Sequence, residues 1–411
     1  MASTAIFVRR SSSLAVTACA LALGCGSSDN TANNAPPTNA GAGGQSAGGA
    51  VSAGSGGEPV ASAGAPSGGS SGSAAGGMSG AAASGGASGS AGAAGAGMSG
   101  AGTGTCAAMG TQADPGTMGD GKTNLDPPYM PAPETTMHLN NAPKGKVNGM
   151  DVGSGNPKPL IYAAKTQYPG LSQMLKYEYW IYVPAQYKMG CGAALMVFQD
   201  GIHFVGNDDA KVNLPTVMDN LIASGDMPVT IGLFINPGEP GDGHYDGNEY
   251  GNRSKQYDTN SPVYSTFLID EFVPNVVAKD YSIVTDPDGW GTSGHSSGGI
   301  AAYITGWYRP DKFRKLLTLD ASFPNTGNYM GVSLLSSIDQ SPAKPLRVYL
   351  MSGPKDLTQD WYTQNTSAAT KLAAKMYHYQ YRVEQSTHYP PLGAQADIAT
   401  AMRWMWRGYK I

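Results

Sequence analysis

The stretch that decides the fold is Gly294-His295-Ser296-Ser297-Gly298-Gly299. It follows the short run 290–293 and opens the segment 300–304, which we predict as a helix. A strand, a G-x-S-x-G sequence and a helix in succession form a nucleophile elbow, whose glycines permit a turn too tight for side chains. Such a turn lifts the Ser296 hydroxyl off the end of the sheet and points the following N–H groups into the same space. Ser296 is therefore the candidate nucleophile.

Strand-like and helix-like segments alternate on both sides of this motif. Continuous apolar runs of strand length at 193–198 and 229–235 are typical of strands covered on both faces. Further strands are predicted at 177–184, 316–319, 347–351 and 379–383, and further helices at 213–224, 264–277, 367–377 and 396–409. This alternation predicts an α/β fold, with a mostly parallel central sheet and helices on both faces. The active site of such a sheet lies at the carboxyl ends of its strands.

A serine nucleophile needs a base, and the base can be sought among only six histidines. His388 lies in a loop after the strand predicted to end near Val383 and before the last predicted helix. That is the place of the base in the serine, acid, histidine order of α/β-hydrolases. The other five lie before the motif, inside it or at the start of a strand: His138, His203, His244, His295 and His378. We therefore predict His388 as the base.

The acid that orients the base should follow a strand between the nucleophile and the histidine. Asp356 lies just past the predicted strand 347–351, and Asp320 lies past the earlier strand 316–319. Asp356 occupies the commoner place, so we favour it over Asp320, which stays an alternative.

The tetrahedral transition state of acyl transfer needs N–H groups that already point at the developing oxyanion. One candidate is the backbone N–H of Ser297, directly after the nucleophile. The other should come from the loop after Phe198, where Gly201 allows the chain to turn an N–H inward. The N–H of Ile202 is the first choice there, and the N–H of Gly201 is the second.

These residues and their neighbours resemble the putative esterase family. The resemblance rests on 198–201 (Phe-Gln-Asp-Gly), 252–254 (Asn-Arg-Ser) with Tyr257-Asp258, the elbow, Asp356, His388 and 404–406 (Trp-Met-Trp), and it covers roughly 160–411. The family includes enterochelin, feruloyl and acetylxylan esterases, S-formylglutathione hydrolase and mycolyltransferases. The resemblance implies an α/β-hydrolase fold with Ser296, Asp356 and His388 as the catalytic triad. It implies ester hydrolysis through an acyl-enzyme, with no metal and no organic cofactor.

Two residues are candidates for substrate binding, Arg253 and Tyr257. A guanidinium can hold a carboxylate or phosphate, but Arg253 could equally be a structural residue paired with Asp258 or Glu249. Gln256 replaces the glutamate usual in the family, and Ile202 is bulkier than the residue usual after the glycine, so the ester stays open. A siderophore ester, a feruloyl or acetyl ester of a polysaccharide and a small lipid ester are all candidates. An acyltransferase with the same triad and a non-catalytic surface binding module are the alternative functions.

The chain before the esterase domain predicts export. Residues 1–25 combine Arg9 and Arg10 with a short apolar core, typical of a lipoprotein signal peptide with Cys25, or alternatively Cys19, as the lipidated residue. Residues 26–112 are rich in Gly, Ala and Ser and are predicted to be a disordered linker. Residues 113–411 form the esterase domain. We expect a protein of the bacterial cell envelope, held by a lipid anchor or otherwise secreted.

Charge and cysteine content limit the other partners. The net charge is −4 and only 14% of the residues are charged, which gives no electrostatic footprint for nucleic acid. Cys106 and Cys191 remain after the signal peptide, and in an oxidising compartment they are expected to form a disulfide.

Overall fold

The structure is a computed structural model, and it describes residues 116–117, 120–206, 212–245, 251–323, 334–389 and 391–409. All of them belong to one of the two units into which the chain divides, residues 96–411. The expected signal peptide and linker lie outside the described residues. Within the described ranges, no helix combines the length and the apolar character that crossing a membrane requires. Cys191 is disulfide-bonded, while its expected partner Cys106 falls outside these ranges.

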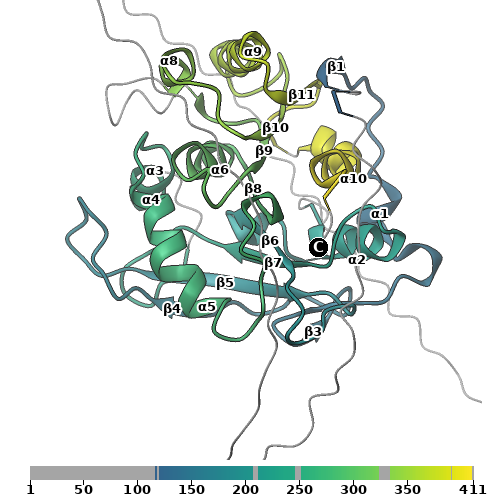
Figure 1. Ribbon diagram of the computed structural model, residues 1–411, viewed down its shortest axis with the longest axis vertical. Coiled ribbons are helices and arrows are strands. Elements are labelled where there is room, and N and C mark those ends of the chain that lie inside the picture. Colours follow the sequence, from purple (N-terminus) through teal and green to yellow (C-terminus); the bar gives the residue numbers. More distant parts are fainter. Residues whose placement is uncertain are drawn as a thin grey trace, which may run out of the picture. The chain divides into compact units, whose positions relative to one another are not determined.

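A single twisted sheet runs through the domain (Figure 1). Its strands follow the order β1-β11-β10-β9-β8-β6-β7-β5-β2-β3, and β4 pairs with β5. The strands from β1 to β7 in that order pair in parallel, whereas β5, β2, β3 and β4 pair antiparallel. Their bounds are β1 Gly121–Asn124, β2 Lys146–Val147, β3 Met150–Asp151, β4 Leu160–Ala163, β5 Lys176–Val183, β6 Ala194–Gln199, β7 Thr230–Ile235, β8 Trp290–His295, β9 Lys315–Leu319, β10 Arg347–Ser352 and β11 His378–Val383. The prediction of a mostly parallel sheet is confirmed.

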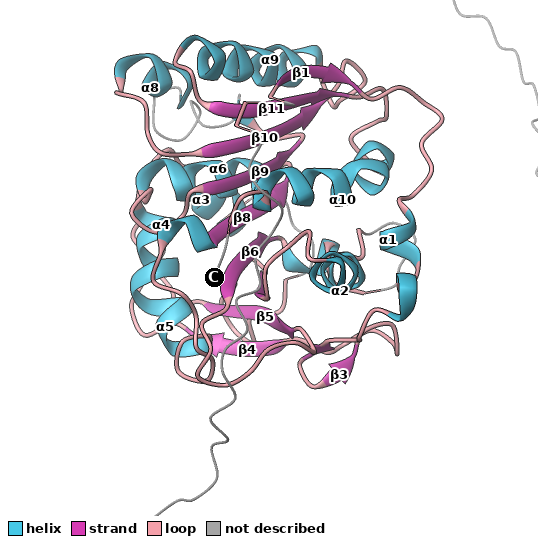
Figure 2. Cartoon of the chain, turned by 45° about the vertical axis from the view of Figure 1, so that its right-hand side comes forward, coloured by secondary structure: helices cyan, strands magenta, loops and turns pink. Residues whose placement is uncertain are grey.

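Helices cover both faces of this sheet, as predicted, and the domain has an α/β-hydrolase fold. Figure 2 shows α2 and α10 on one side and α4 and α5 on the other. The helix bounds are α1 Pro133–Thr136, α2 Leu214–Ser224, α3 Asn252–Tyr257, α4 Val263–Thr266, α5 Val273–Val276, α6 Ser297–Tyr308, α8 Leu334–Gln340, α9 Gln359–Ala374 and α10 Leu392–Trp406. Short 3₁₀ turns lie at Leu139–Asn141, Gly201–His203 and Pro287–Gly289, and a π-helical stretch joins α4 to α5 at Phe267–Phe272.

The two-residue period of a strand divides the core between the two faces. Met196 and Phe198 of β6 pack into the cluster that includes α2 and α10, while Leu195 and Val197 pack into the cluster with α4 and α5. Every residue of β6 is buried. This is why the run 193–198 is apolar throughout and does not alternate with polar residues.

Several boundaries differ from the predicted ones. The helix expected at 264–277 changes to a π-helical stretch at Phe267–Phe272, which runs directly into α5, and Pro274 is the second residue of α5. The helix expected at 367–377 begins earlier, at Gln359. Hydrophobic patterning does not reveal its first two turns, because they are polar and carry little apolar periodicity. Strands β1 to β4 at the sheet edges are short and mostly exposed, so hydrophobic patterning does not reveal them.

Candidate active site

The elbow is built as the motif predicts. Strand β8 ends at His295, α6 begins at Ser297, and Ser296 between them adopts φ 62° and ψ −127°. A side chain in this left-handed region is strained, and such strain concentrates at functional sites. The N–H of Ser296 donates to the carbonyl of Leu319 at 2.9 Å, which fixes the turn to the end of β9.

The flanking glycines are required by close approach. A Cβ on Gly294 would lie 2.2 Å from the carbonyl oxygen of Gly298. A Cβ on Gly298 would lie 2.5 Å from Oδ2 of Asp200. The second contact also shows that the loop after β6 lies against the first turn of α6. The region expected to supply the oxyanion donors is thus assembled around Ser296.

Asp356 and His388 form a short hydrogen-bonded pair. Asp356 Oδ1 lies 2.6 Å from His388 Nδ1, and the same oxygen accepts the N–H of Leu357 at 2.7 Å. The Asp356 side chain is fully buried, whereas the His388 ring retains 12% exposure. Because Nδ1 faces the carboxylate, Nε2 of His388 is left for a second partner.

The His388 ring lies beside the elbow. Its centroid is 4.4 Å from that of His295, the residue before Ser296, and 5.2 Å from that of Trp361 in an edge-on contact. Among the described residues, Ser296 Oγ makes no hydrogen bond. In sites without substrate, such catalytic hydrogen bonds are often long and tighten only in the complex.

Asp320, the alternative acid, pairs instead with His295. Oδ2 of Asp320 lies 3.4 Å from Nε2 of His295, and both side chains are largely buried. Burial raises the pKa of Asp320 well above its usual value, and the charge of Asp356 raises it further. Burial, reinforced by the neighbouring His388, holds the pKa of His295 well below its usual value. This second histidine–carboxylate pair was not predicted, because it depends on the β8–β9 register that sets His295 opposite Leu319.

The oxyanion candidates differ in availability. The N–H of Ile202, the first choice, donates to Oδ1 of Asn236 at 3.1 Å and is therefore already engaged. The N–H of Gly201, the second choice, makes no hydrogen bond within the described part of the chain. The N–H of Ser297 begins α6, so it has no partner within the helix. The geometry therefore favours Gly201 and Ser297.

Arg253 and Tyr257 occupy buried positions, which favours the structural alternative for Arg253. The guanidinium of Arg253 holds Asp200 with two contacts, Nε to Oδ1 at 3.0 Å and Nη2 to Oδ2 at 2.7 Å. Arg253 is 4% exposed and Tyr257 is fully buried. The Tyr257 hydroxyl accepts the N–H of Asp200 at 3.4 Å. Both residues support the loop after β6. The hydrogen-bonded partner of Arg253 is Asp200 and not Asp258, while the alternative partner Glu249 lies outside the described residues.

Asp258 supports the elbow through hydrogen bonds to two serine hydroxyls. Its Oδ2 accepts the hydroxyl of Ser297 at 3.0 Å, and its Oδ1 accepts the hydroxyl of Ser322 at 2.7 Å. Asp258 is fully buried, and that burial raises the pKa of its carboxyl. The first turn of α6 and the loop after β9 are thereby tied to one side chain.

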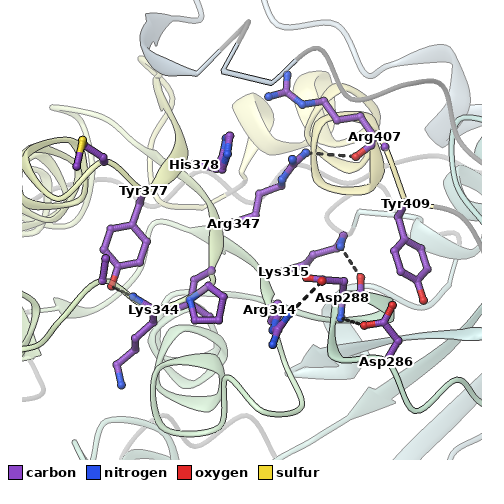
Figure 3. A pocket seen from close by; sticks show the side chains of 15 residues that line it. Asp286, Asp288, Arg314, Lys315, Lys344, Arg347, Tyr377, His378, Arg407 and Tyr409 are labelled. Carbon is purple, nitrogen blue, oxygen red and sulfur yellow. Dashed lines mark hydrogen bonds and ion pairs between the residues drawn. The ribbon is translucent and has the colours of Figure 1, made fainter. Parts of the chain in front are cut away.

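A pocket of about 610 Å³ lies at the opposite end of the strands (Figure 3). Its lining includes Lys315, Arg347 and His378, the first residues of β9, β10 and β11. Asp320 and Asp356, in contrast, follow the last residues of β9 and β10. Active sites of parallel sheets lie at the carboxyl ends of the strands, so this basic pocket is not the candidate active site.

Comparison with known proteins agrees with this geometry. The family model described as "Putative esterase" matches residues 174–391, more than half of the chain. Among solved structures, the chain is similar to a ferulic acid esterase of the anaerobic fungus Anaeromyces mucronatus, with 13% identity, a TM-score of 0.50, and 66% of this chain and 94% of that chain covered. It is also similar to the enterobactin esterase of Shigella flexneri, with 16% identity, a TM-score of 0.48, and 65% and 61% covered.

The chain thus spans less than two thirds of the length of that enterobactin esterase. No curated protein matches the chain. The likeness to solved structures bears on the fold alone, whereas the family match covers the elbow, Asp356 and His388 together. On that match, the chain belongs to the putative esterase family.

Proposed function

We propose that this protein is a serine esterase that hydrolyses a carboxylic ester through an acyl-enzyme. Ser296 attacks the ester carbonyl carbon while His388 takes the hydroxyl proton, and His388 then gives that proton to the departing alcohol. Water attacks the acyl-enzyme in the same way and releases the acid. The observation that carries this proposal is the 2.6 Å contact between Asp356 and His388 beside the strained Ser296.

Each remaining group has a role in this sequence. Asp356 fixes the ring of His388 and stabilises its cationic form, so that Nε2 faces the serine side. The N–H groups of Ser297 and Gly201 stabilise the oxyanion of each tetrahedral intermediate.

Support for a substrate class comes from the family, whose model matches residues 174–391. We propose an ester of a siderophore or a feruloyl or acetyl ester of a polysaccharide, presented to the protein outside the cytoplasm. Support for export comes from residues 1–25, which resemble a lipoprotein signal peptide with Cys25 as the lipidated residue. Labelling with a palmitate analogue tests the anchor: Cys25→Ser should abolish incorporation, and Cys19→Ser should leave it intact. The reverse result would assign the anchor to Cys19.

Turnover of p-nitrophenyl acetate tests the chemistry. Ser296→Ala should reduce kcat by about 10⁴-fold or more, to the level that binding and the oxyanion donors alone supply. Ser293→Ala is a matched control, because Ser293 lies on β8 only three residues away and its buried hydroxyl makes no hydrogen bond. Wild-type turnover in folded Ser296→Ala protein would refute the assignment. Product analysis with a sugar alcohol present separates hydrolysis from transfer to an acceptor.

A further inference from the structure

Three side chains from three different segments converge beside the elbow. One ligand atom each from His295, Asp320 and His388 lies within 4.8 Å of the other two. His295 closes β8, Asp320 follows β9, and His388 lies in the loop after β11. The set of two imidazoles and one carboxylate is the donor set of many sites for Zn²⁺ and related transition-metal ions.

Two polar atoms of this cluster, and one of the adjacent Asp356, lack hydrogen-bond partners. Nε2 of His295, Oδ1 of Asp320 and Oδ2 of Asp356 are buried and make no hydrogen bond among the described residues. A buried polar atom without a partner is costly, and three in one place are rare in a native fold. A divalent cation would give Nε2 of His295 a partner and would offset the two nearby carboxylates of Asp320 and Asp356.

The geometry of one pair already suits a metal ion. His295 Nε2 and Asp320 Oδ2 are 3.4 Å apart. Two ligand atoms at a tetrahedral angle on an ion with bonds of about 2.1 Å lie at about this separation. The contact of His388 Nδ1 with Asp356 leaves Nε2 as the third ligand, and a carboxylate behind a ligating histidine is the usual support of a zinc site.

We propose that His295, Asp320 and His388 form a Zn²⁺ site, and that Zn²⁺ bound there inhibits the esterase by occupying the nitrogen of His388 that serves Ser296. The inhibition rests on the proposed function, but the metal binding does not. The ion is an inhibitory ligand and takes no part in hydrolysis, because it engages the base that the serine needs. The site lies within the described residues and is separate from the basic pocket at the amino ends of the strands.

Metal binding is measured first in a protein that cannot turn over. EDTA-treated and dialysed Ser296→Ala protein is titrated with Co²⁺, whose visible absorption reports tetrahedral coordination, and then with Zn²⁺ in a calorimeter. We expect one ion per chain and displacement of Co²⁺ by Zn²⁺. His295→Asn and Asp320→Asn, each in the same background, should weaken binding by at least about tenfold. His378→Asn is the matched control, because His378 pairs with Asp120 at the other end of the sheet.

Inhibition is measured next in the active enzyme. Zn²⁺ should lower p-nitrophenyl acetate turnover, and EDTA should restore it. The Zn²⁺ concentration for half inhibition should rise at least about tenfold in His295→Asn, read as the ratio of rates with and without the ion. The folding of His295→Asn and of Asp320→Asn is checked by circular dichroism. If only one of them folds, that variant alone carries the test.

The outcomes separate this inference from the proposed function. Absence of Co²⁺ and Zn²⁺ binding to the Ser296→Ala protein, or binding that survives both substitutions, overturns the metal site while leaving an active esterase untouched. Tight binding in a wild-type protein without esterase activity upholds the site and overturns the proposed function and the inhibition. Binding with no loss of turnover overturns the inhibitory role alone.

Discussion

Asp200 and Arg253 form a buried, two-contact ion pair that fixes the loop after β6 against α3. The same carboxylate lies against the backbone of Gly298, in the first turn of α6. The Asp200 side chain therefore connects the loop after β6, helix α3 and the elbow. Arg253 of the esterase motif Asn252-Arg253-Ser254 thus supports the loop after β6.

Loss of Arg253 should destabilise the whole domain. Arg253→Leu leaves the carboxylate of Asp200 buried without its cation, which costs about 3–5 kcal/mol in known cases. Lys146→Ala is the control, because Lys146 and Asp151 form an ion pair with both side chains 59% exposed, worth at most about 1 kcal/mol. Urea unfolding of both variants measures the difference. Equal stabilities would contradict the structural role of Arg253.

A methyl group on Gly298 should disrupt the elbow. The added Cβ would lie 2.5 Å from Oδ2 of Asp200, so the oxyanion loop must shift. We expect Gly298→Ala to cost about 1–3 kcal/mol and to lower kcat/KM, because the N–H donors move with the loop. Gly170→Ala has open space around the new methyl but a backbone φ of 81°, so it should cost stability through strain while leaving kcat/KM unchanged. Retained activity in Gly298→Ala would show that the loop tolerates displacement.

Substitution of the two candidate acids, Asp356 and Asp320, should lower kcat to different extents. Asp356→Asn should lower kcat by about 10⁴-fold, because the ring of His388 loses the carboxylate that sets its tautomer. Asp320→Asn removes a carboxyl that faces His295, so its loss in kcat should be smaller by at least about tenfold. Rates with p-nitrophenyl acetate give both values. A larger loss in Asp320→Asn would transfer the role of the acid to Asp320.

Glu384 should make stability depend on pH. Burial raises the pKa of Glu384 to about 7 in the folded protein, against 4.5 for an unperturbed glutamate. The folded state therefore binds more protons than the unfolded state between these values, and the free energy of unfolding falls as the pH rises through this window. We expect a fall of about 1–3 kcal/mol between pH 5 and pH 8 from this group.

Glu384→Gln isolates this contribution. The glutamine cannot ionise, so the variant should lose less stability than the wild type between pH 5 and pH 8. Urea unfolding at both pH values measures the difference, and parallel curves would show that Glu384 does not titrate in this range. Activity is a second readout, because Glu384 accepts the N–H of Ser386 at 2.6 Å in the loop that carries His388.

The sequence predicts the positions that depend on chain order. Ser296, Asp356 and His388 each follow a strand that the sequence predicts, so their meeting at one edge of the sheet follows from parallel topology. The choice of Asp356 over Asp320 follows from the same order, and the 2.6 Å contact of Asp356 with His388 agrees with it.

The contacts that were missed depend on neighbours far apart in the sequence. The N–H of Ile202 is occupied because Asn236, at the end of the neighbouring strand β7, lies next to it. Arg253 finds Asp200 across 53 positions, and no local pattern favours this partner over Asp258. His295 meets Asp320 only because β8 and β9 are adjacent and in a particular register. Spacing along the chain carries no information on such contacts.

Strand β9 separates the nucleophile from its acid–base pair. Ser296 follows β8, Asp356 follows β10, and β9 pairs with both. Neighbouring strands lie about 4.8 Å apart, so the strands that carry the serine and the acid are about 10 Å apart. Hydrogen bonding within the sheet fixes this distance. The loop from β11 to α10 must carry His388 across that span. Directed evolution of the rate should therefore find its most productive changes in the length and stiffness of this loop, whereas substitutions within the strands would mainly cost stability.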